Sequence, residues 1–346
     1  DGVLSLSAGA RSSMISKLGR SAHPGGLRNL MTQRALILGS TGSIGQSALN
    51  VIESLRAEWK VVGLAAGSKG AELAAQANRY RPEAIAIADA DRVGEVEREL
   101  EYSPKLLAGA KALAQLVEEV PADCVVCAVV GASGLPATLR AVELGRRIAL
   151  ANKEALVVAG SLLMPLARQS GATLIPVDSE HSAIFQVLQA GRRQDVRTVH
   201  LTASGGPFRT WNAEDMEGVT LEQAMRHPVW SMGPKITVDS ATMMNKALEI
   251  VEARWLFDLE PEQIKVLVHP ESIVHSLVEF CDGSTLAQLG SPDMRTPIQY
   301  ALTFPRRMEC PSPPLDLLRT GTLTFEAPDP ERFPALRLGY EVARRG

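Results

Sequence analysis

The stretch Leu36-Ile-Leu-Gly-Ser-Thr-Gly-Ser-Ile-Gly45 decides the fold that we expect for this chain of 346 residues. An apolar run leads into Gly39, Gly42 and Gly45, spaced G-x-x-G-x-x-G, and an amphipathic segment follows. Glycine lets the backbone turn tightly, approach a pyrophosphate and pack the helix against the strand. The first N–H groups of that helix attract phosphates. The pattern indicates a dinucleotide-binding turn, although such a turn can also be a plain connection.

Apolar runs alternate with helical segments such as Ser47–Leu55 and Leu73–Tyr80. Strands are predicted at Ala35–Gly39, Val61–Ala66, Ala84–Ala88, Cys124–Val130, Ile148–Ala151 and Leu174–Val177. Because strand and helix alternate, the fold class is α/β, with a Rossmann-like parallel sheet domain at residues 31–177.

The organisation changes after Asp178, where longer helices and strands at Val266–His269 and His275–Phe280 predict a second domain, of α+β type, over residues 178–304. The Pro-rich stretch Pro305–Pro314 then indicates a linker, so residues 305–346 would comprise this linker and the start of a third unit. Residues 1–30 lack hydrophobic periodicity, so we expect a disordered N-terminal extension.

Composition narrows the functional class. Apolar residues make up 45% of the chain and the formal charge is −3, which offers no basic surface for nucleic acid. No apolar run reaches the roughly 20 residues of a membrane helix. Four cysteines favour a reducing compartment, and the C-x-x-C of Cys124 and Cys127 lies in a strand whose alternation points them to opposite faces. We expect a cytoplasmic protein, or one of a plastid-type organelle if residues 1–30 are a transit peptide.

The end of the second strand indicates which dinucleotide binds. NAD sites usually place an acidic residue there, against the ribose 2'-hydroxyl. Here the strand ends Ala65-Ala-Gly-Ser-Lys69, without a carboxylate, and Lys69 can pair with a 2'-phosphate. NADPH is therefore predicted, with a solvated loop lysine as the alternative.

A metal site is predicted at Val177-Asp-Ser-Glu-His181. Asp178 and Glu180 are two residues apart, so on extended backbone both point to the same side. Crowded carboxylates repel unless a cation compensates, and oxygen ligands favour Mg²⁺ or Mn²⁺. The alternatives are plain loop charges, or Asp178 as the cap of a helix from Ser182.

Glu249 supplies a third carboxylate to the predicted site. It lies on a helix that Asp239 or Ser240 can cap. Asn245, Lys246 and Glu249 share one face of this helix, so a phosphate and a metal could be bound one turn apart. The alternative is an ordinary exposed Lys–Glu pair.

Two loops complete the candidate site. Thr202–Phe208 offers backbone N–H groups for an anion, or is a plain turn. Arg226–Gly233 has the composition of a mobile lid around Trp230, which could instead be a buried structural residue. We interpret three histidines without identifiable partners as structural: His200, His269 and His275.

Six motifs together resemble one enzyme family. They are Gly-Ser-Thr-Gly-Ser-Ile-Gly45, Ala151-Asn-Lys-Glu154, Val177-Asp-Ser-Glu-His181, Ala203-Ser-Gly-Gly-Pro-Phe208, Arg226-His-Pro-Val-Trp-Ser-Met-Gly233 and Val238-Asp-Ser-Ala-Thr-Met-Met-Asn-Lys246. In this order they closely resemble the deoxyxylulose phosphate reductoisomerases, from Met31 to Gly346. The resemblance implies that residues 178–304 are the catalytic domain. The family continues past Gly346 into a C-terminal helical domain, so the resemblance also implies that residues 305–346 contain only the start of that domain.

The resemblance implies roles for individual residues. The NADPH site would comprise Thr41, Gly42, Ser43, Ile44, Gly67, Ser68, Lys69, Asn152, Glu154 and Gly233. The metal ligands would be Asp178, Glu180 and Glu249. Substrate would contact Lys153, Ser179, Glu180, Ser204, His227, Ser240, Asn245, Lys246 and Glu249. Lys153, Glu180, His227 and Trp230 would take part in catalysis.

The implied reaction rearranges the carbon skeleton of 1-deoxy-D-xylulose 5-phosphate and reduces the product with NADPH to 2-C-methyl-D-erythritol 4-phosphate. Mg²⁺ or Mn²⁺, with Co²⁺ as a further candidate, would polarise the substrate oxygens. The implied assembly is a homodimer. Two rival interpretations remain: another two-domain NADPH oxidoreductase without the carboxylate cluster, and a non-catalytic NADPH sensor.

Overall fold

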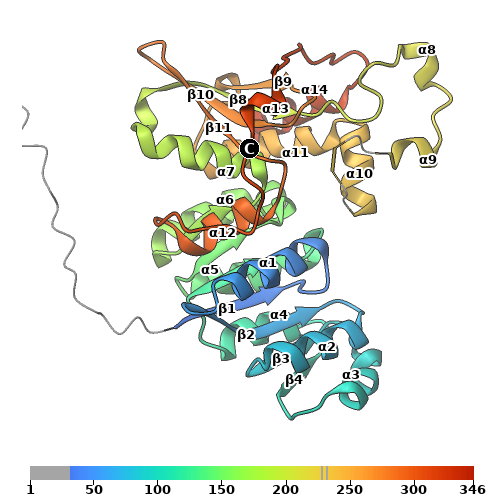
Figure 1. Cartoon of the computed structure of the whole chain (residues 1–346), viewed down its shortest axis with the longest axis vertical. Helices are drawn as coiled ribbons and strands as arrows, with labels where there is room; N and C mark the ends of the chain where they lie inside the picture. Colours follow the sequence, from blue (N-terminus) through green and yellow to red (C-terminus); the bar gives the residue numbers. More distant parts are fainter. Residues whose placement is uncertain (1–31, 227–228, 231–232) are drawn as a thin grey trace, which may run out of the picture. The chain divides into compact units, whose positions relative to one another are not determined.

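The computed structural model describes residues 32–226, 229–230 and 233–346. Within them, Thr32–Gly346 forms one compact unit that contains two β-sheets (Figure 1). The predicted extension at residues 1–30 and the predicted site residue His227 lie outside the described residues. The predicted domain boundaries at Asp178 and Pro305 stay predictions, although the change of sheet falls near the first of them.

The first sheet has seven strands, all parallel, in the order β4-β3-β2-β1-β5-β6-β7. Its strands are β1 (Gln33–Leu38), β2 (Trp59–Ala66), β3 (Ala84–Ile87), β4 (Lys105–Ala108), β5 (Cys124–Cys127), β6 (Arg147–Leu150) and β7 (Thr173–Pro176). The α/β prediction is therefore confirmed. The strand that we did not predict, β4, is an edge strand without a fully buried residue, so it lacks the apolar run that marks the others.

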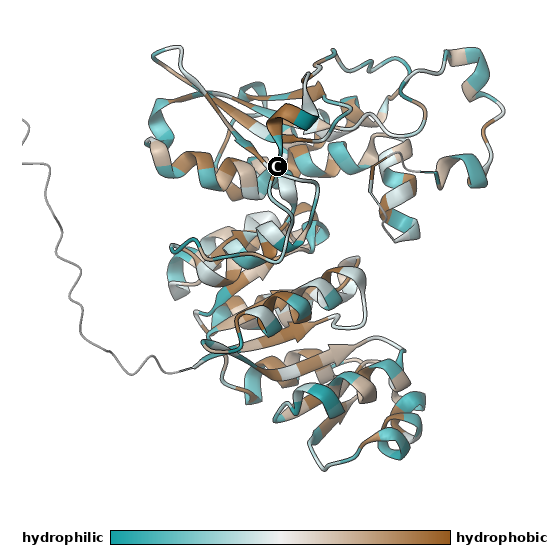
Figure 2. Cartoon of the chain, in the orientation of Figure 1, coloured by the Kyte–Doolittle hydropathy of each residue, from teal (hydrophilic) through white to brown (hydrophobic). Residues whose placement is uncertain are grey.

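Helices cover both faces of this sheet, as apolar strands between amphipathic helices require. They are α1 (Ser43–Ser54), α2 (Gly70–Tyr80), α3 (Val93–Glu99), α4 (Ala112–Glu119), α5 (Leu135–Glu143), α6 (Lys153–Ser170) and α12 (Arg295–Thr303). Figure 2 shows apolar strands between helices whose outer faces are hydrophilic. Cys124 belongs to the core on one face and Cys127 to the core on the other, so the predicted opposite orientation is confirmed.

The Gly-rich turn lies where the strand order changes direction, between β1 and β5. Gly39 has φ +82°, and a β-carbon there would lie 2.6 Å from the carbonyl oxygen of Ala128, which follows β5. A β-carbon on Gly45 would lie 2.3 Å from the carbonyl oxygen of Gly39. The carboxyl ends of parallel strands at such a switch point form the usual crevice for a nucleotide.

The second sheet has four strands in the order β11-β10-β8-β9. They are β8 (Val196–Ala203), β9 (Ile264–Val268), β10 (Val274–Phe280) and β11 (Thr285–Leu289), and only β8 and β9 are parallel. The accompanying helices are α7 (Ser179–Val187), α8 (Ala213–Met216), α9 (Leu221–Ala224), α10 (Pro234–Ala241), α11 (Met244–Leu256), α13 (Leu317–Thr320) and α14 (Ala335–Arg345).

Helix α11 joins the two sheets because it packs against both α6 and α14. A β-carbon on Gly160 of α6 would lie 2.3 Å from the indole ring of Trp255, and one on Gly339 of α14 would lie 2.7 Å from the backbone of Ala247. These close contacts fix α11 between α6 and α14. Among the described residues, no helix is both long and apolar enough to cross a membrane.

We predict that Gly45→Ala lowers the free energy of unfolding by about 1–3 kcal/mol, because its β-carbon would overlap backbone atoms that cannot move aside. Gly42→Ala is the matched control, since its β-carbon would lie 3.4 Å from the carbonyl oxygen of Gly39 at φ −80°. Urea denaturation of both variants measures the difference. Equal stability of the two variants would contradict the close packing of the turn.

The buried cysteines give a second prediction. Burial raises the pKa of the Cys124 and Cys127 thiols to about 12, whereas Cys281 is exposed and Cys310 is half-buried. A thiol-specific reagent at pH 8 should therefore label Cys281 and Cys310 in the native protein, and Cys124 and Cys127 only after unfolding. Mass spectrometry of labelled peptides reads this out. Rapid labelling of Cys124 in the native protein would contradict the structure.

Candidate active site

A cavity of about 600 Å³ opens at the carboxyl ends of strands from both sheets. It brings together most of the site residues that the sequence predicts. Those that line it are Ser43, Ile44, Asn152, Lys153, Glu154, Asp178, Ser179, Glu180, Ser204, Trp230, Gly233, Ser240, Asn245 and Lys246.

Other predicted residues do not line this cavity: Thr41, Gly42, Gly67, Ser68, Lys69 and Glu249. Glu249 is fully buried beneath the wall. Lys69 is exposed at the start of α2 and forms an ion pair with Glu72, with 3.4 Å between Nζ and Oε1. The end of β2 lies beside the Gly-rich turn, because the N–H of Ser40 donates to the carbonyl of Ala65. The pairing of Lys69 with a 2'-phosphate therefore stays a prediction.

The parallel register of β6 and β7 brings Lys153 and Asp178 together. Leu150 pairs with Pro176, so the residues that follow these strands leave the sheet side by side. Asn152 caps α6 by accepting the N–H of Ala155 at 2.8 Å, which places Lys153 in the first turn. The Lys153 ammonium forms an ion pair with the Asp178 carboxylate and is nearly buried.

Helix α11 supplies the opposite wall. Nζ of Lys153 lies 3.0 Å from Oε1 of Glu249 and donates to Oδ1 of Asn245 at 2.8 Å. Nζ of Lys246 lies 2.9 Å from Oε1 of Glu180 and also forms an ion pair with Glu249. Lys246 and Glu249 are buried, so the alternative of an ordinary exposed Lys–Glu pair is wrong.

Two local arguments from the sequence need correction. Asp178 is the residue before α7, so Glu180 lies in the first helical turn and not on extended backbone; the charges converge because α7 and α11 face each other. The predicted cap of α11 is also wrong. Asp239 and Ser240 lie in the separate helix α10, and α11 starts after Met243, whose φ of 58° breaks the chain between the two helices.

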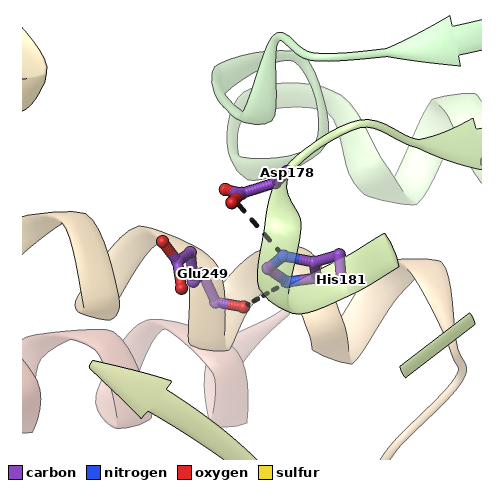
Figure 3. Close-up of side chains that lie close together, drawn as sticks. All are labelled: Asp178, His181 and Glu249. Atoms are coloured by element: carbon purple, nitrogen blue, oxygen red, sulfur yellow. Dashed lines mark hydrogen bonds and ion pairs between the residues drawn. The ribbon is translucent and has the colours of Figure 1, made fainter. Parts of the chain in front are cut away.

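His181 is a site residue that the sequence analysis missed. Its Nε2 lies 3.0 Å from the carbonyl oxygen of Glu249, and its Nδ1 lies 4.0 Å from Oδ2 of Asp178 (Figure 3). The same Nδ1 lies 3.4 Å from Oε2 of Glu252. The available signal was its position three residues after Asp178 on a helix, which places both on one face. One ligand atom each from Asp178, His181 and Glu249 lies within 4.8 Å of the others.

The cluster carries more negative than positive charge. Asp178, Glu180, Glu249 and Glu252 face two ammonium groups, those of Lys153 and Lys246. Fully ionised, these six groups have a net charge of −2.

The pKa values reflect this imbalance. Burial would raise the pKa of Asp178, but Lys153 more than offsets it and lowers that pKa. Burial, followed by repulsion from Glu249, raises the pKa of Glu180. Burial also raises the pKa of Glu252 to about 7, although His181 opposes the shift.

A divalent cation fits this cluster by charge and by ligand type. Its two positive charges equal the deficit of the six groups, and carboxylate oxygens are the donors that Mg²⁺ and Mn²⁺ prefer. Asp178 and Glu249 already lie close enough to share one ion. The predicted ligand Glu180 instead contacts Lys246 and accepts the hydroxyl of Ser179 at 2.7 Å.

The other end of the cavity fits a dinucleotide. Ser43 and Ile44, at the N-terminus of α1, line it, and the first turn of α1 contains no acidic residue that would repel a phosphate. Trp230 and Gly233 also line the cavity. The cavity thus places an anion site next to the carboxylate cluster.

Family models match nearly the whole described chain. The model described as 1-deoxy-D-xylulose 5-phosphate reductoisomerase matches residues 35–160, that of its C-terminal domain matches residues 174–257, and the DXP reductoisomerase C-terminal domain matches residues 289–346. The chain is 53% identical over 311 residues to the 1-deoxy-D-xylulose 5-phosphate reductoisomerase of Pelodictyon phaeoclathratiforme, which covers 90% of this chain and 81% of the relative. This chain belongs to the 1-deoxy-D-xylulose 5-phosphate reductoisomerase family.

Solved structures agree with this assignment. The reductoisomerase of Zymomonas mobilis in complex with NADPH superposes with a TM-score of 0.86 at 46% identity, over 91% of this chain and 82% of that one. A DOX-P reductoisomerase in complex with NADPH, fosmidomycin and magnesium also gives a TM-score of 0.86, at 43% identity over 91% of this chain and 80% of that one. The predicted family is confirmed, as is the predicted α/β fold with a Rossmann-like parallel sheet followed by an α+β part, whose sheet is mixed.

The buried carboxyl of Glu252 gives a prediction on pH. Its pKa is raised in the folded protein, so between about pH 4.5 and 7 the folded state holds a proton that the unfolded chain releases. In metal-free buffer, Glu252→Gln should therefore gain stability over the parent protein as pH rises through this window, by on the order of 2 kcal/mol at pH 8.

Urea denaturation at pH 5, 6 and 8 measures the effect, with the exposed residue Glu214 changed to Gln as the control. A stability difference between Glu252→Gln and the parent protein that does not change with pH would contradict this account of Glu252.

Proposed function

We propose that this chain catalyses the NADPH-dependent conversion of 1-deoxy-D-xylulose 5-phosphate into 2-C-methyl-D-erythritol 4-phosphate, with a divalent cation. Family membership supports the reaction, and relatives of known structure bind NADPH and magnesium. The observation that carries the proposal is the buried cluster of Lys153, Asp178, Glu249 and Lys246 beside the dinucleotide crevice. A simple dehydrogenase needs the crevice but not this cluster.

The residues of the cluster divide into two groups. Asp178, Glu180 and Glu249 would hold a divalent cation, whose chemistry is to polarise the ketone and hydroxyl oxygens of the substrate. Lys153 contacts two of these carboxylates and lines the cavity, so its ammonium can donate a hydrogen bond to a substrate oxygen. Its pKa is raised, since burial is outweighed by Asp178 and Glu249, so it stays charged for that task.

The phosphate of the substrate would bind to donors from the second half of the chain. Ser204, Ser240, Asn245 and Lys246 line the cavity, and their hydroxyl, amide and ammonium groups suit phosphate oxygens. Lys246 forms ion pairs with both Glu180 and Glu249, and a phosphate would compete for its ammonium. The substrate would thus be held at both ends, which orients the reacting carbons.

The N-terminal crevice would orient the cofactor. Ser43 and Ile44 of the turn, with Asn152, Glu154 and Gly233, would hold NADPH, which supplies the hydride. Trp230 lines the cavity and would exclude water from the bound substrate. We also propose, as the sequence predicts, that Arg226–Gly233 acts as a lid over the substrate.

The remaining expectations on partners and location are also proposals. We infer a cytoplasmic enzyme, which the bacterial relatives support, and a homodimer, which rests on the resemblance to the family alone. The edge strand β11, whose Thr285, Leu286 and Ala287 are exposed, is a surface on which a second copy could pair.

Oxidation of NADPH tests the function directly. We predict that its absorbance falls only when 1-deoxy-D-xylulose 5-phosphate and Mg²⁺ or Mn²⁺ are both present. Oxidation without added metal, after treatment with a chelator, would favour a metal-free dehydrogenase. Consumption of neither substrate nor NADPH under any condition would favour a non-catalytic sensor.

The role of Glu249 is tested by Glu249→Gln, which keeps the size of the side chain but removes its charge. We predict at least about a tenfold rise in the metal concentration for half-maximal activity, because one anionic ligand is lost. Glu341→Gln, an exposed carboxylate of α14, is the control. If Glu249→Gln matches the parent enzyme at limiting metal, Glu249 is not a ligand.

A further inference from the structure

The imidazole of His269 lies at the carboxyl end of β9 and lines the cavity, although the side chain is fully buried. We propose that His269 is a positioning residue for substrate: it fixes the loop Pro270–Ile273 as the cavity wall beside the phosphate end. This inference rests on the proposed function, because it deepens the account of the same cavity.

Both ring nitrogens of His269 are used. Nδ1 lies 2.8 Å from the carbonyl oxygen of Thr324 and 3.0 Å from Oε2 of Glu271. Nε2 lies 3.2 Å from the backbone nitrogen of Ile273 and 3.1 Å from that of Val274. Two N–H donors point at Nε2, so this nitrogen must be the acceptor and the ring proton must lie on Nδ1. The ring is therefore a two-sided clamp and not a free acid or base.

The clamp holds a backbone that needs support. Ser272 has φ +52°, a conformation that residues other than glycine rarely adopt, and its side chain lines the cavity. Its N–H donates to the carbonyl of His269 at 3.1 Å, and the next two N–H groups donate to the imidazole. Loss of the acceptor at Nε2 would leave two N–H groups without a partner and free the loop to move.

The same residue joins this loop to two other segments. The backbone N–H of His269 donates to the carbonyl of Ala203 at 2.7 Å, directly before Ser204 of the proposed phosphate site. On the other side, the ring stacks on Phe325 at 4.8 Å between centroids, and Glu326 pairs with Val268. His269 thus sets the distance between Ser204 and the loop at Ser272.

Two amide variants separate the two sides of the clamp. His269→Asn can place its amide nitrogen near the position of Nδ1 and keep the link to Thr324, but it leaves the N–H groups of Ile273 and Val274 without an acceptor. His269→Gln can place its amide oxygen near the position of Nε2 and keep that acceptor, but it loses the link to Thr324. If His269 had only a structural role, both variants would show a similar fall in melting temperature and the same KM for substrate.

We expect His269→Asn to raise KM for 1-deoxy-D-xylulose 5-phosphate by about tenfold or more, because the substrate wall is displaced. We expect His269→Gln to keep this KM within about twofold of the parent enzyme, and KM for NADPH to stay unchanged in both. His200, on the neighbouring strand β8 and outside the cavity, gives the matched controls His200→Asn and His200→Gln, which should have equal KM values.

Equal KM values for the two His269 variants, or a higher value for His269→Gln, would overturn the positioning role. An inactive parent enzyme would instead overturn the proposed function. Should neither variant fold, nitrogen NMR of histidine-labelled parent protein decides: coupling from the Ile273 and Val274 amide protons to Nε2 supports the clamp, and a protonated Nε2 overturns it.

Discussion

The ammonium of Lys153, buried between the carboxylates of Asp178 and Glu249, is the interaction on which the rest of the site depends. It joins the end of β6 to the start of α7 and to the middle of α11, so three segments far apart in the chain meet at one charge. Burying a carboxylate without such a partner would cost several kcal/mol. The cluster is therefore held together by electrostatics, although its net charge remains negative.

The net negative charge of this cluster connects the stability of the protein to its function. A site that is fully neutral without its ion would gain little from binding one, whereas this cluster leaves Glu180 and Glu252 with raised pKa values. Binding a divalent cation would relieve the repulsion among these buried carboxylates. The repulsion that destabilises the metal-free protein would therefore contribute to the free energy of metal binding. His181 and Glu252 lie behind the proposed ligands and orient them, since the ring contacts the backbone of Glu249 and faces Asp178.

The sequence anticipated much of the first sheet and less of the second. Strands such as β1 and β5 are continuous apolar runs, because both faces of a parallel sheet are covered. The edge strand β4 is partly exposed, and the apolar residues of β8 are interrupted by Arg197, Thr198, His200 and Thr202. Neither strand is a continuous apolar run, so both escaped prediction. The helix break at Met243 was also missed, since a left-handed residue other than glycine leaves no sign in composition.

The order of the motifs in the sequence was enough to determine the family. The dinucleotide turn could be predicted because a tight turn needs glycine, and the metal site because Mg²⁺ and Mn²⁺ prefer the carboxylate oxygens of Asp and Glu. Tertiary structure alone decided which charges meet. The register of β6 with β7 places Lys153 beside Asp178. The packing of Gly160 on α6 against Trp255 on α11 brings Glu249, also on α11, into contact with Lys153. It also showed the roles of His181 and His269, whose partners are separated from them by many residues. Sequence spacing describes neighbours on one helix or strand, whereas contacts between elements follow from how their surfaces pack.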